Sequence, residues 1–84
     1  MYYVYYLLLK NGDVYKGSCA DLKKRMAEHT RGNVLSTKGQ RPFKLIGYEA
    51  YALKSDAQRR ERFLKTTEGR RLLRQQHRDI LGSK

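Results

Sequence analysis

The opening stretch of the chain constrains the fold most strongly. Tyr2–Leu9 is a run of eight aromatic and aliphatic residues, and the turn signal Lys10-Asn11-Gly12-Asp13 follows it directly. A short apolar run that ends at an Asn-Gly turn is typical of a strand entering a β-hairpin, with Val14–Gly17 as the return strand. Both alternating faces of the first strand are apolar, so we expect it to be covered on both sides.

Two turns are compatible with this hairpin, and they place its tyrosines differently. A two-residue loop at residues 11–12 turns Tyr5 and Tyr15 to opposite faces of the hairpin. A three-residue loop over residues 10–12 pairs Leu9 with Asp13 and places both tyrosines diagonally on one face. Core packing is the ordinary role for either tyrosine.

Further along the chain, the pattern predicts a helix, a loop and a third strand. Asp21 is placed to cap a helix that runs to about Arg31 and stops at Gly32. Residues 33–40 are polar and are expected to form a loop. Phe43–Tyr51 then has the composition of a strand.

The C-terminal part of the chain is predicted to be helical. Ser55-Asp56-Ala57-Gln58 matches a capping box, so a helix is expected to run from there to about Lys65. Gly69 is expected to interrupt it before Arg70–Leu81 resumes a basic helix. The order ββαβαα belongs to the α+β class, as a small three-stranded antiparallel sheet flanked by helices.

The chain is strongly basic. Its 84 residues include 19 Lys and Arg against 8 Asp and Glu, which gives a formal net charge of +11. This length is enough for one small domain, so we expect residues 1–84 to form a single domain. Self-repulsion at such a charge destabilises the compact state, and an anionic partner explains its presence.

Several protein classes are excluded by what the chain lacks. Cys19 is the single cysteine, so no internal disulfide forms, and a cytoplasmic location is expected. The apolar run at residues 2–9 is too short to cross a membrane and lacks the basic flank of a signal peptide, so no membrane partner is expected. Neither a phosphate-binding glycine loop nor a nucleophile elbow occurs, and we expect no small-molecule cofactor.

Three polar residues of the first predicted helix lie along one side of it. Asp21, Arg25 and His29 follow i, i+4 and i+8 spacing. Ordinary roles for them are an Asp21–Arg25 ion pair and an interaction of His29 with the helix dipole.

Glu61 lies where an apolar residue is expected. Ala57, Glu61 and Leu64 follow i, i+4 and i+7 spacing, which places the carboxylate on the inward face of its helix. A buried carboxylate needs a cation or hydrogen-bond donors. One candidate partner is a neighbouring arginine at position 59, 60 or 62, and the other is Mg²⁺, which accepts one carboxylate together with waters and phosphate.

Together these residues resemble the GIY-YIG nuclease family, in its small single-domain bacterial form. The two tripeptides of that family match Tyr3-Val4-Tyr5 and Tyr15-Lys16-Gly17, with Tyr3 in place of Gly and Lys16 in place of Ile. The similarity covers about residues 2–73 and includes the spacing of the tripeptides from Arg25, His29 and Glu61.

The resemblance implies a metal-dependent endonuclease that nicks DNA with low sequence specificity, with a role in DNA repair or recombination. It implies that Glu61 holds a single Mg²⁺ or Mn²⁺ and that Arg25 binds phosphate oxygens. Tyr5, in preference to Tyr15, is expected to act as general base, its phenolate favoured by the metal and Arg25, with Tyr15 and His29 in its hydrogen-bond network. The resemblance also implies that DNA, or alternatively RNA, is the partner, bound by cations of the loop and the tail: Lys38, Arg41, Arg70, Arg71 and Arg74. Gly17 is expected to let the backbone pass close to the site.

This mechanism requires Glu61 to lie on the same side of the sheet as the rings of Tyr5 and Tyr15, around one hollow. With Glu61 on the opposite side, only a positively charged scaffold would remain. The alternative function is accordingly a catalytically weak or inactive module that binds DNA or structured RNA.

Overall fold

The computed structural model describes residues 1–82 and has the α+β architecture predicted from the sequence. Apart from two short helices, its element order is ββαβαα. The elements are β1 (Tyr2–Leu8), β2 (Val14–Cys19), α1 (Leu22–Thr30), α2 (Leu35–Lys38), β3 (Lys44–Tyr51), α3 (Lys54–Leu64), α4 (Thr67–Gln76) and α5 (Arg78–Leu81).

The three strands form an antiparallel sheet in the order β2-β1-β3, so β2 and β3 are its two edges. The hairpin between β1 and β2 has the three-residue form. The backbone N–H of Leu9 donates to the Asp13 carbonyl at 2.8 Å, and Gly12 has a φ of +92°. Leu7 therefore pairs with Tyr15, and Tyr5 pairs with Gly17, which places Tyr5 and Tyr15 on one face.

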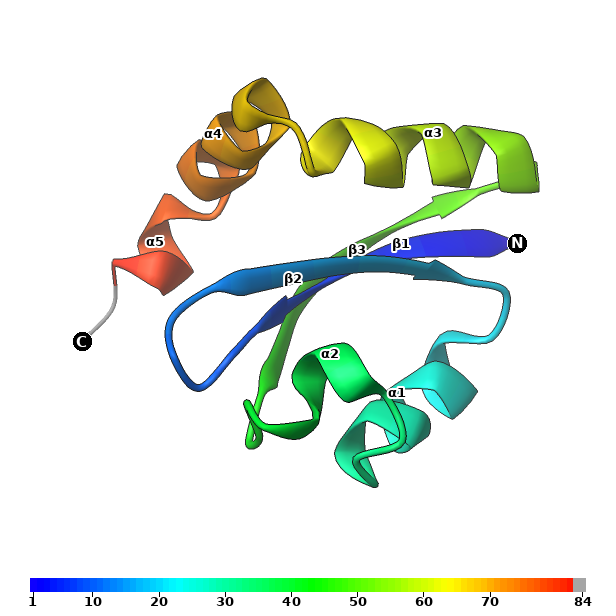
Figure 1. Cartoon of the computed structure of the whole chain (residues 1–84). Coiled ribbons are helices and arrows are strands. Elements are labelled where there is room, and N and C mark those ends of the chain that lie inside the picture. Colours follow the sequence, from blue (N-terminus) through cyan, green and yellow to red (C-terminus); the bar gives the residue numbers. More distant parts are fainter. Residues whose placement is uncertain (83–84) are drawn as a thin grey trace.

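Helices cover both faces of the sheet, as the apolar pattern of the first strand predicts. In Figure 1, α1 and α2 lie on one face and α3 and α4 on the other; we call these the α1 face and the α3 face. Val4 and Tyr6 point to the α3 face, where they form the core with three helical residues, Ala57, Leu64 and Leu73. Full burial of a side chain the size of leucine contributes about 1.5–3 kcal/mol to folding.

Two local predictions about helix boundaries hold, and one is incomplete. Asp21 caps α1 by accepting a hydrogen bond from the backbone N–H of Lys24 at 3.0 Å. After α1, Gly32 takes a left-handed conformation with a φ of +79°. The predicted loop at residues 33–40 contains the short helix α2, in which Thr37 is buried.

Two other boundary predictions are wrong. The N-cap of α3 is Leu53, which has no side-chain cap, and Ser55 lies inside the first turn, so the capping box does not form. Gly69 does not interrupt a helix, because it lies in the first turn of α4. The break lies earlier, where the Thr66 hydroxyl caps α4 by accepting from the N–H of Gly69 at 3.1 Å.

None of the helices within residues 1–82 has the length and apolar character needed to span a bilayer.

Candidate active site

A chain of hydrogen bonds leads from the exposed side of helix α1 into the layer between α1, α2 and the sheet. Arg25 Nε donates to the Tyr5 hydroxyl at 3.4 Å, and that hydroxyl lies 2.8 Å from His29 Nε2. His29 Nδ1 lies 2.7 Å from Thr37 Oγ1, and the Thr37 hydroxyl donates to the Val34 carbonyl. Because Thr37 donates onward, it accepts from Nδ1–H, which leaves Nε2 to accept from Tyr5. The chain thus favours a neutral imidazole with its proton on Nδ1.

The inner part of this chain is closed to solvent. Tyr5, His29 and Thr37 are all 0% exposed. Burial lowers the pKa of His29, and the nearby charge of Arg25 lowers it further. Burial also raises the pKa of Tyr5 to about 12, although the hydrogen bond from Arg25 opposes this. The expected phenolate at Tyr5 is therefore not what the structure favours, and a buried phenol has no access to an attacking water.

Tyr15 is the phenol of this group that reaches the surface. Its ring centroid lies 6.3 Å from that of Tyr5 and 5.4 Å from that of His29. Tyr15 is half-buried, so part of it remains accessible to solvent. Tyr15 thus shares the aromatic cluster of Tyr5 but keeps contact with water.

Arg25 presents part of its guanidinium to solvent. Its side chain is 36% exposed and pairs with Glu28 at 3.1 Å rather than with Asp21, which caps the helix instead. The hydrogen bond with Tyr5 raises the pKa of Arg25 and outweighs the effect of burial. A guanidinium has five N–H donors, so those that Tyr5 and Glu28 do not use can bind an anion.

Glu61 lies on the opposite side of the sheet from this cluster. Its Oε1 accepts from the Ser18 hydroxyl at 2.5 Å and its Oε2 from Lys65 Nζ at 2.6 Å. Ser18 pairs with Val4, whose side chain points to the α3 face. The expectation of a single hollow around Glu61 and both tyrosines is therefore wrong. Tyr5 and Tyr15 lie on the α1 face, whereas α3, which carries Glu61, packs on the opposite face of the sheet.

The requirement that Glu61 share one face with the tyrosines is nevertheless stricter than the chemistry needs, because the two groups can approach each other around the edge of the sheet. Gly17 lies opposite Tyr5, and a Cβ at Gly17 would lie 2.5 Å from Tyr5 Cζ, so only glycine fits there without a shift. The next residue, Ser18, holds Glu61 on the α3 face. Since β2 is an edge strand, no further strand separates the two faces beside Gly17 and Ser18.

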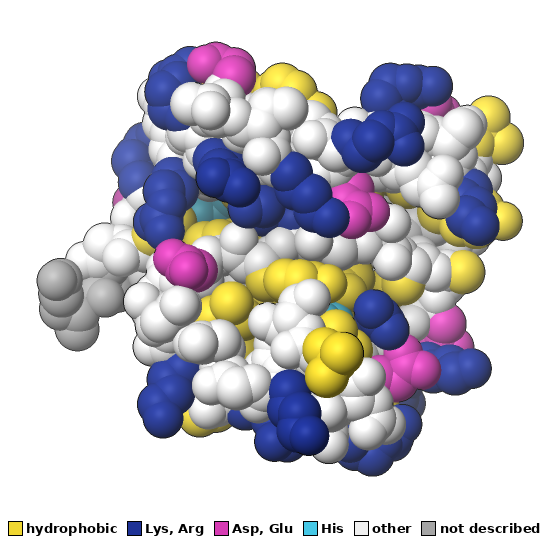
Figure 2. Space-filling model, viewed as in Figure 1, with side chains coloured by type: hydrophobic (Ala, Val, Ile, Leu, Met, Phe, Trp, Pro, Cys, Tyr) yellow, Lys and Arg dark blue, Asp and Glu magenta, His cyan; other side chains and the backbone are white. Residues whose placement is uncertain are grey.

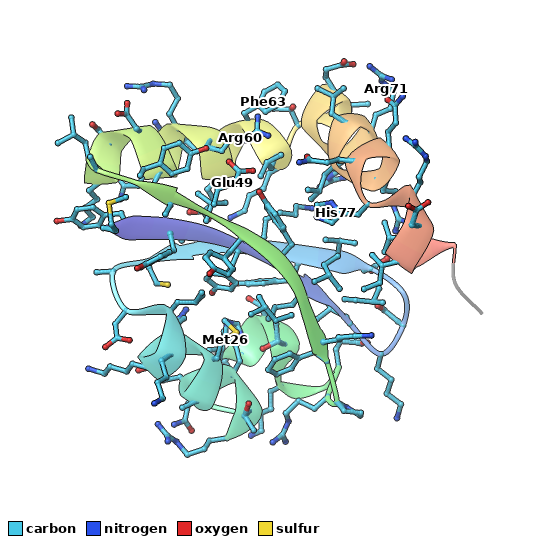
Figure 3. The ribbon with its side chains drawn as sticks, turned by 180° about the vertical axis from the view of Figure 1, so that it is seen from behind. Met26, Glu49, Arg60, Phe63, Arg71 and His77 are labelled. Carbon is cyan, nitrogen blue, oxygen red and sulfur yellow. The ribbon has the colours of Figure 1, made fainter. Side chains whose placement is uncertain are left out.

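Two of the three arginines near Glu61 in the sequence have other partners. Arg60 Nε donates to Glu49 at 3.1 Å, and Glu49 also accepts from the hydroxyls of Tyr6 and Tyr51. Figure 3 shows Arg60 and Glu49 close together between α3 and β3. Arg59 pairs with Asp56 at 2.8 Å. Neither Arg59 nor Arg60 is the cation that Glu61 binds.

Glu61 fits a divalent cation as a single carboxylate ligand. Burial alone would raise the pKa of Glu61, but hydrogen bonds from Lys65 and Ser18 outweigh it and hold the pKa below its ordinary value. The group is thus ionised at neutral pH, and its side chain is 20% exposed. Within residues 1–82 no group of three His, Cys, Asp or Glu side chains is clustered. One carboxylate, completed by waters and a substrate phosphate, is a ligand set that Mg²⁺ accepts.

The basic residues predicted to bind nucleic acid occupy different settings. Lys38 is exposed, whereas Arg41 donates to the carbonyls of Lys38 and Thr30. Arg71 pairs with Glu68 at 2.6 Å. By contrast, the remaining two, Arg70 and Arg74, line a cleft between the β1–β2 hairpin and α4.

Four further site residues were missed by sequence reasoning. Thr37 ends the hydrogen-bond chain, and Ser18 and Lys65 hold Glu61. Lys16 lines the cleft beside Tyr15. Lys65 carried a usable signal, because it follows Glu61 at i+4 spacing, whereas Ser18 and Thr37 depend on contacts distant in sequence.

A hairpin with two tyrosines, an arginine on the next helix and a glutamate on the helix after the third strand define the class of GIY-YIG catalytic domains. The sequence pattern of the GIY-YIG catalytic domain matches residues 1–75. The chain therefore belongs to this family.

The relatives of the chain are small bacterial proteins. It is 36% identical over 66 residues to UPF0213 protein SSP2268 of Staphylococcus saprophyticus, covering 77% of this chain and 80% of the relative. It is 35% identical to UPF0213 protein CPE1444 of Clostridium perfringens, covering 100% of this chain and 86% of the relative. The solution structure of UPF0213 protein BH0048 from Bacillus halodurans is similar with a TM-score of 0.56 and 32% identity, covering 87% of this chain and 82% of the other.

Proposed function

We propose that this protein is a metal-dependent endonuclease that hydrolyses DNA phosphodiester bonds, producing nicks with low sequence specificity. One observation carries the proposal. Arg25, partly exposed, and Glu61, ionised, lie on either side of the consecutive residues Gly17 and Ser18 of an edge strand. A phosphodiester lying against that edge would meet a cationic donor from one face and a metal-binding carboxylate from the other.

In this mechanism each group has a separate task. Glu61 would hold Mg²⁺ or Mn²⁺, which when bound neutralises phosphoryl charge and stabilises the leaving oxygen. Arg25 binds non-bridging oxygens through its free N–H groups. We assign the general base to Tyr15 rather than Tyr5, because Tyr15 reaches solvent and Tyr5 is fully buried. Tyr5 then acts as a positioning residue that links Arg25 to His29.

A second candidate function is a nucleic-acid-binding module without cleavage activity, acting on DNA or structured RNA. The placement of Glu61 on the face opposite the tyrosines favours this candidate, since the metal-binding carboxylate and the general base then act from different sides of β2. The cationic side chains would bind phosphates in either case. A cytoplasmic role in DNA repair or recombination is part of the first candidate only.

The deciding experiment is a nicking assay on supercoiled plasmid, branched DNA and RNA, with Mg²⁺, Mn²⁺ or EDTA. Wild-type protein should nick DNA only with metal, and Glu61→Gln should lose at least about 100-fold in rate, as is typical when a group that stabilises the transition state is removed. Glu68→Gln is the matched control, because Glu68 is an exposed glutamate outside the site. Equal nicking by the wild type and Glu61→Gln would refute the metal assignment.

Metal binding can be measured without activity. Adding Mn²⁺ should broaden the amide NMR signals of Ser18 and Glu61 in the wild type and in Glu68→Gln, but not in Glu61→Gln. Metal binding without nicking of any substrate would support the binding module over the nuclease. Broadening that is unchanged in Glu61→Gln would contradict a metal site at this carboxylate.

A further inference from the structure

A cleft on the α4 side of β2 is lined by cations, most of which have no task in the proposed chemistry. Its volume is about 540 Å³, and it lies between the β1–β2 hairpin, the end of α3 and α4. Four cationic side chains line it: Lys16, Lys65, Arg70 and Arg74. We call this the α4 cleft. Figure 2 shows Lys and Arg side chains gathered along the boundary between the α3–α4 layer and β2.

Most of the positive charge in the α4 cleft is not neutralised by the protein. Among residues 1–82, only Lys65 of these four cations has a carboxylate partner, which is Glu61. Asp13 is the single acidic residue that lines the cleft. Burial lowers the pKa of Lys16, and the charges of Arg70, Lys65 and Arg74 lower it further. Like charges held together in a concave surface attract an anion.

The polar contacts inside the α4 cleft leave donors available for that anion. Lys16 Nζ donates to the Val14 carbonyl at 3.0 Å, and Arg74 donates to the Gly12 carbonyl at 3.3 Å. Each uses one of its several N–H donors in this way, and carbonyls bring no net charge. These contacts hold Lys16 and Arg74 in place at the hairpin, and the cleft keeps its positive charge.

The α4 cleft continues the line on which Glu61 lies. Glu61 contacts Ser18, and Lys16 lies two residues away on the same strand, which is about 7 Å at the usual rise of a strand. Side chains two residues apart in a strand share one face, so Lys16 and Ser18 both point to the α3 face. The axial rise of one DNA strand is about 3.4 Å per nucleotide, so this distance corresponds to about two nucleotides.

We propose that the α4 cleft binds a backbone phosphate of the DNA strand, about two nucleotides from the phosphate that lies beside Glu61. This inference rests on the proposed function for its substrate, but not on cleavage. The cleft would position the DNA strand along β2, and it would add affinity that does not depend on the base sequence. Lys16, which replaces the Ile of the family tripeptide, gives the strand edge a phosphate ligand.

The test compares two double variants that remove the same charge from one helical region. Arg70→Gln/Arg74→Gln removes two cations from the cleft, whereas Arg71→Gln/Arg78→Gln removes two outside it. Arg71 is expected from the sequence to bind nucleic acid, but it lies on the outer side of α4, away from the sheet (Figure 3), where it pairs with Glu68, so the proposal places it outside the path of the strand. Arg78 is exposed. Affinity for a short DNA duplex is measured in EDTA over a series of salt concentrations, so neither metal nor cleavage enters.

The cleft variant should reduce the slope of log affinity against log salt by about 1, as expected for one lost phosphate contact. The outer variant should keep the wild-type slope. If the double variant fails to fold by circular dichroism, Lys16→Gln replaces it, with Lys24→Gln on the exposed side of α1 as control.

Each other outcome decides the matter as well. Equal slopes in the cleft and outer variants would refute the proposal. Binding of inorganic phosphate in the cleft with an unchanged duplex slope would also refute it, since the site would then take free phosphate only. A reduced slope in a protein that never nicks DNA would support the cleft and refute the nuclease.

Discussion

At the residue scale, the environment of His29 is very different from that of a histidine on the surface. It is fully buried, and both of its ring nitrogens have hydrogen-bond partners, Tyr5 and Thr37. Burial lowers the pKa of His29, so the folded protein holds the imidazole neutral. Protonation would place a charge in an apolar layer and remove the acceptor that Tyr5 needs.

This environment predicts how stability depends on pH. In the unfolded chain His29 titrates near pH 6.5, and in the folded chain its pKa is lower. Between the two values the unfolded state binds more protons, so the free energy of unfolding rises with pH. We expect stability to be complete above about pH 6.5 and to fall below it, by at most about 1.4 kcal/mol per pH unit.

Urea denaturation between pH 5.0 and 7.5 measures this dependence. The slope should disappear in His29→Gln and persist in His77→Gln, which changes the other histidine of the chain. Carboxylates such as Glu61 contribute little in this range, because their ordinary pKa values lie at about 4 and they bind few protons above about pH 5. A slope that is unchanged in His29→Gln would contradict the assignment.

Residue roles were only partly predictable from the sequence. The spacing of Arg25 and His29 placed both on one side of α1, and the structure joins them through Tyr5. The direction of the shift at Tyr5 was not predictable, because it depends on full burial beneath α1. Helical spacing favoured Lys65, four residues after Glu61, as the partner of that carboxylate, because side chains one or two residues apart, such as those of the three neighbouring arginines, do not face each other.

At the element scale, strong apolar periodicity and turn chemistry were enough to find all three strands and the longer helices. Of the two turns that the sequence allowed, the structure has the one that pairs Leu9 with Asp13. The errors lie where tertiary packing outweighs local preference. A glycine inside a helix lowers its stability by about 1 kcal/mol relative to alanine, and for this reason the sequence predicts a break at Gly69. The short helix α2 has too few residues for a periodic signal.

The position of Gly69 is explained by contact between elements. A Cβ at Gly69 would overlap the Phe63 carbonyl oxygen and lie 2.7 Å from Leu64 Cα, both in the last turn of α3. The absence of a side chain therefore lets α4 begin directly against α3. Backbone atoms cannot move aside as the end of a flexible side chain can.

Gly69→Ala is accordingly expected to destabilise the protein, although alanine is the better helix former. Overpacking of this kind costs about 1–3 kcal/mol, and each kcal/mol lowers the Tm of a chain this size by about 4–8 °C. Gly39→Ala is the matched control, because Gly39 has a φ of −82° and open space around its Cβ position. Thermal unfolding followed by circular dichroism compares the two. Equal Tm values would mean that α4 shifts freely on α3.

At the scale of the whole molecule, the site is divided by the sheet. Arg25 and Tyr15 lie on the α1 face and Glu61 on the α3 face, and they approach one another only because β2 is an edge strand. Sequence spacing gives the face of each helix but not the face of the sheet on which that helix packs. The sidedness of Glu61 was thus beyond prediction, whereas the excess of positive charge around the site was visible in the composition.

That excess charge predicts how the whole molecule responds to salt. The net charge is +11, and the molecule measures 36 × 30 × 18 Å. At about 0.01 M salt the screening length is about 30 Å, so charges repel across the entire fold, whereas at about 0.15 M it is about 8 Å and only neighbours interact. Unfolding separates these charges, so the folded state gains more from screening than the unfolded state does.

The Tm should therefore rise as NaCl increases from 10 to 150 mM, in concentrations that span these two screening lengths. A DNA duplex should raise the Tm further at low salt, because a ligand that binds only the folded state stabilises it by mass action. This second rise should shrink as salt weakens phosphate binding. The two effects have opposite salt dependence, so thermal unfolding over a salt series separates them. A Tm that falls with salt would show that the ion pairs of the surface, such as Arg71–Glu68, outweigh the net repulsion, and the composition would then no longer require an anionic partner.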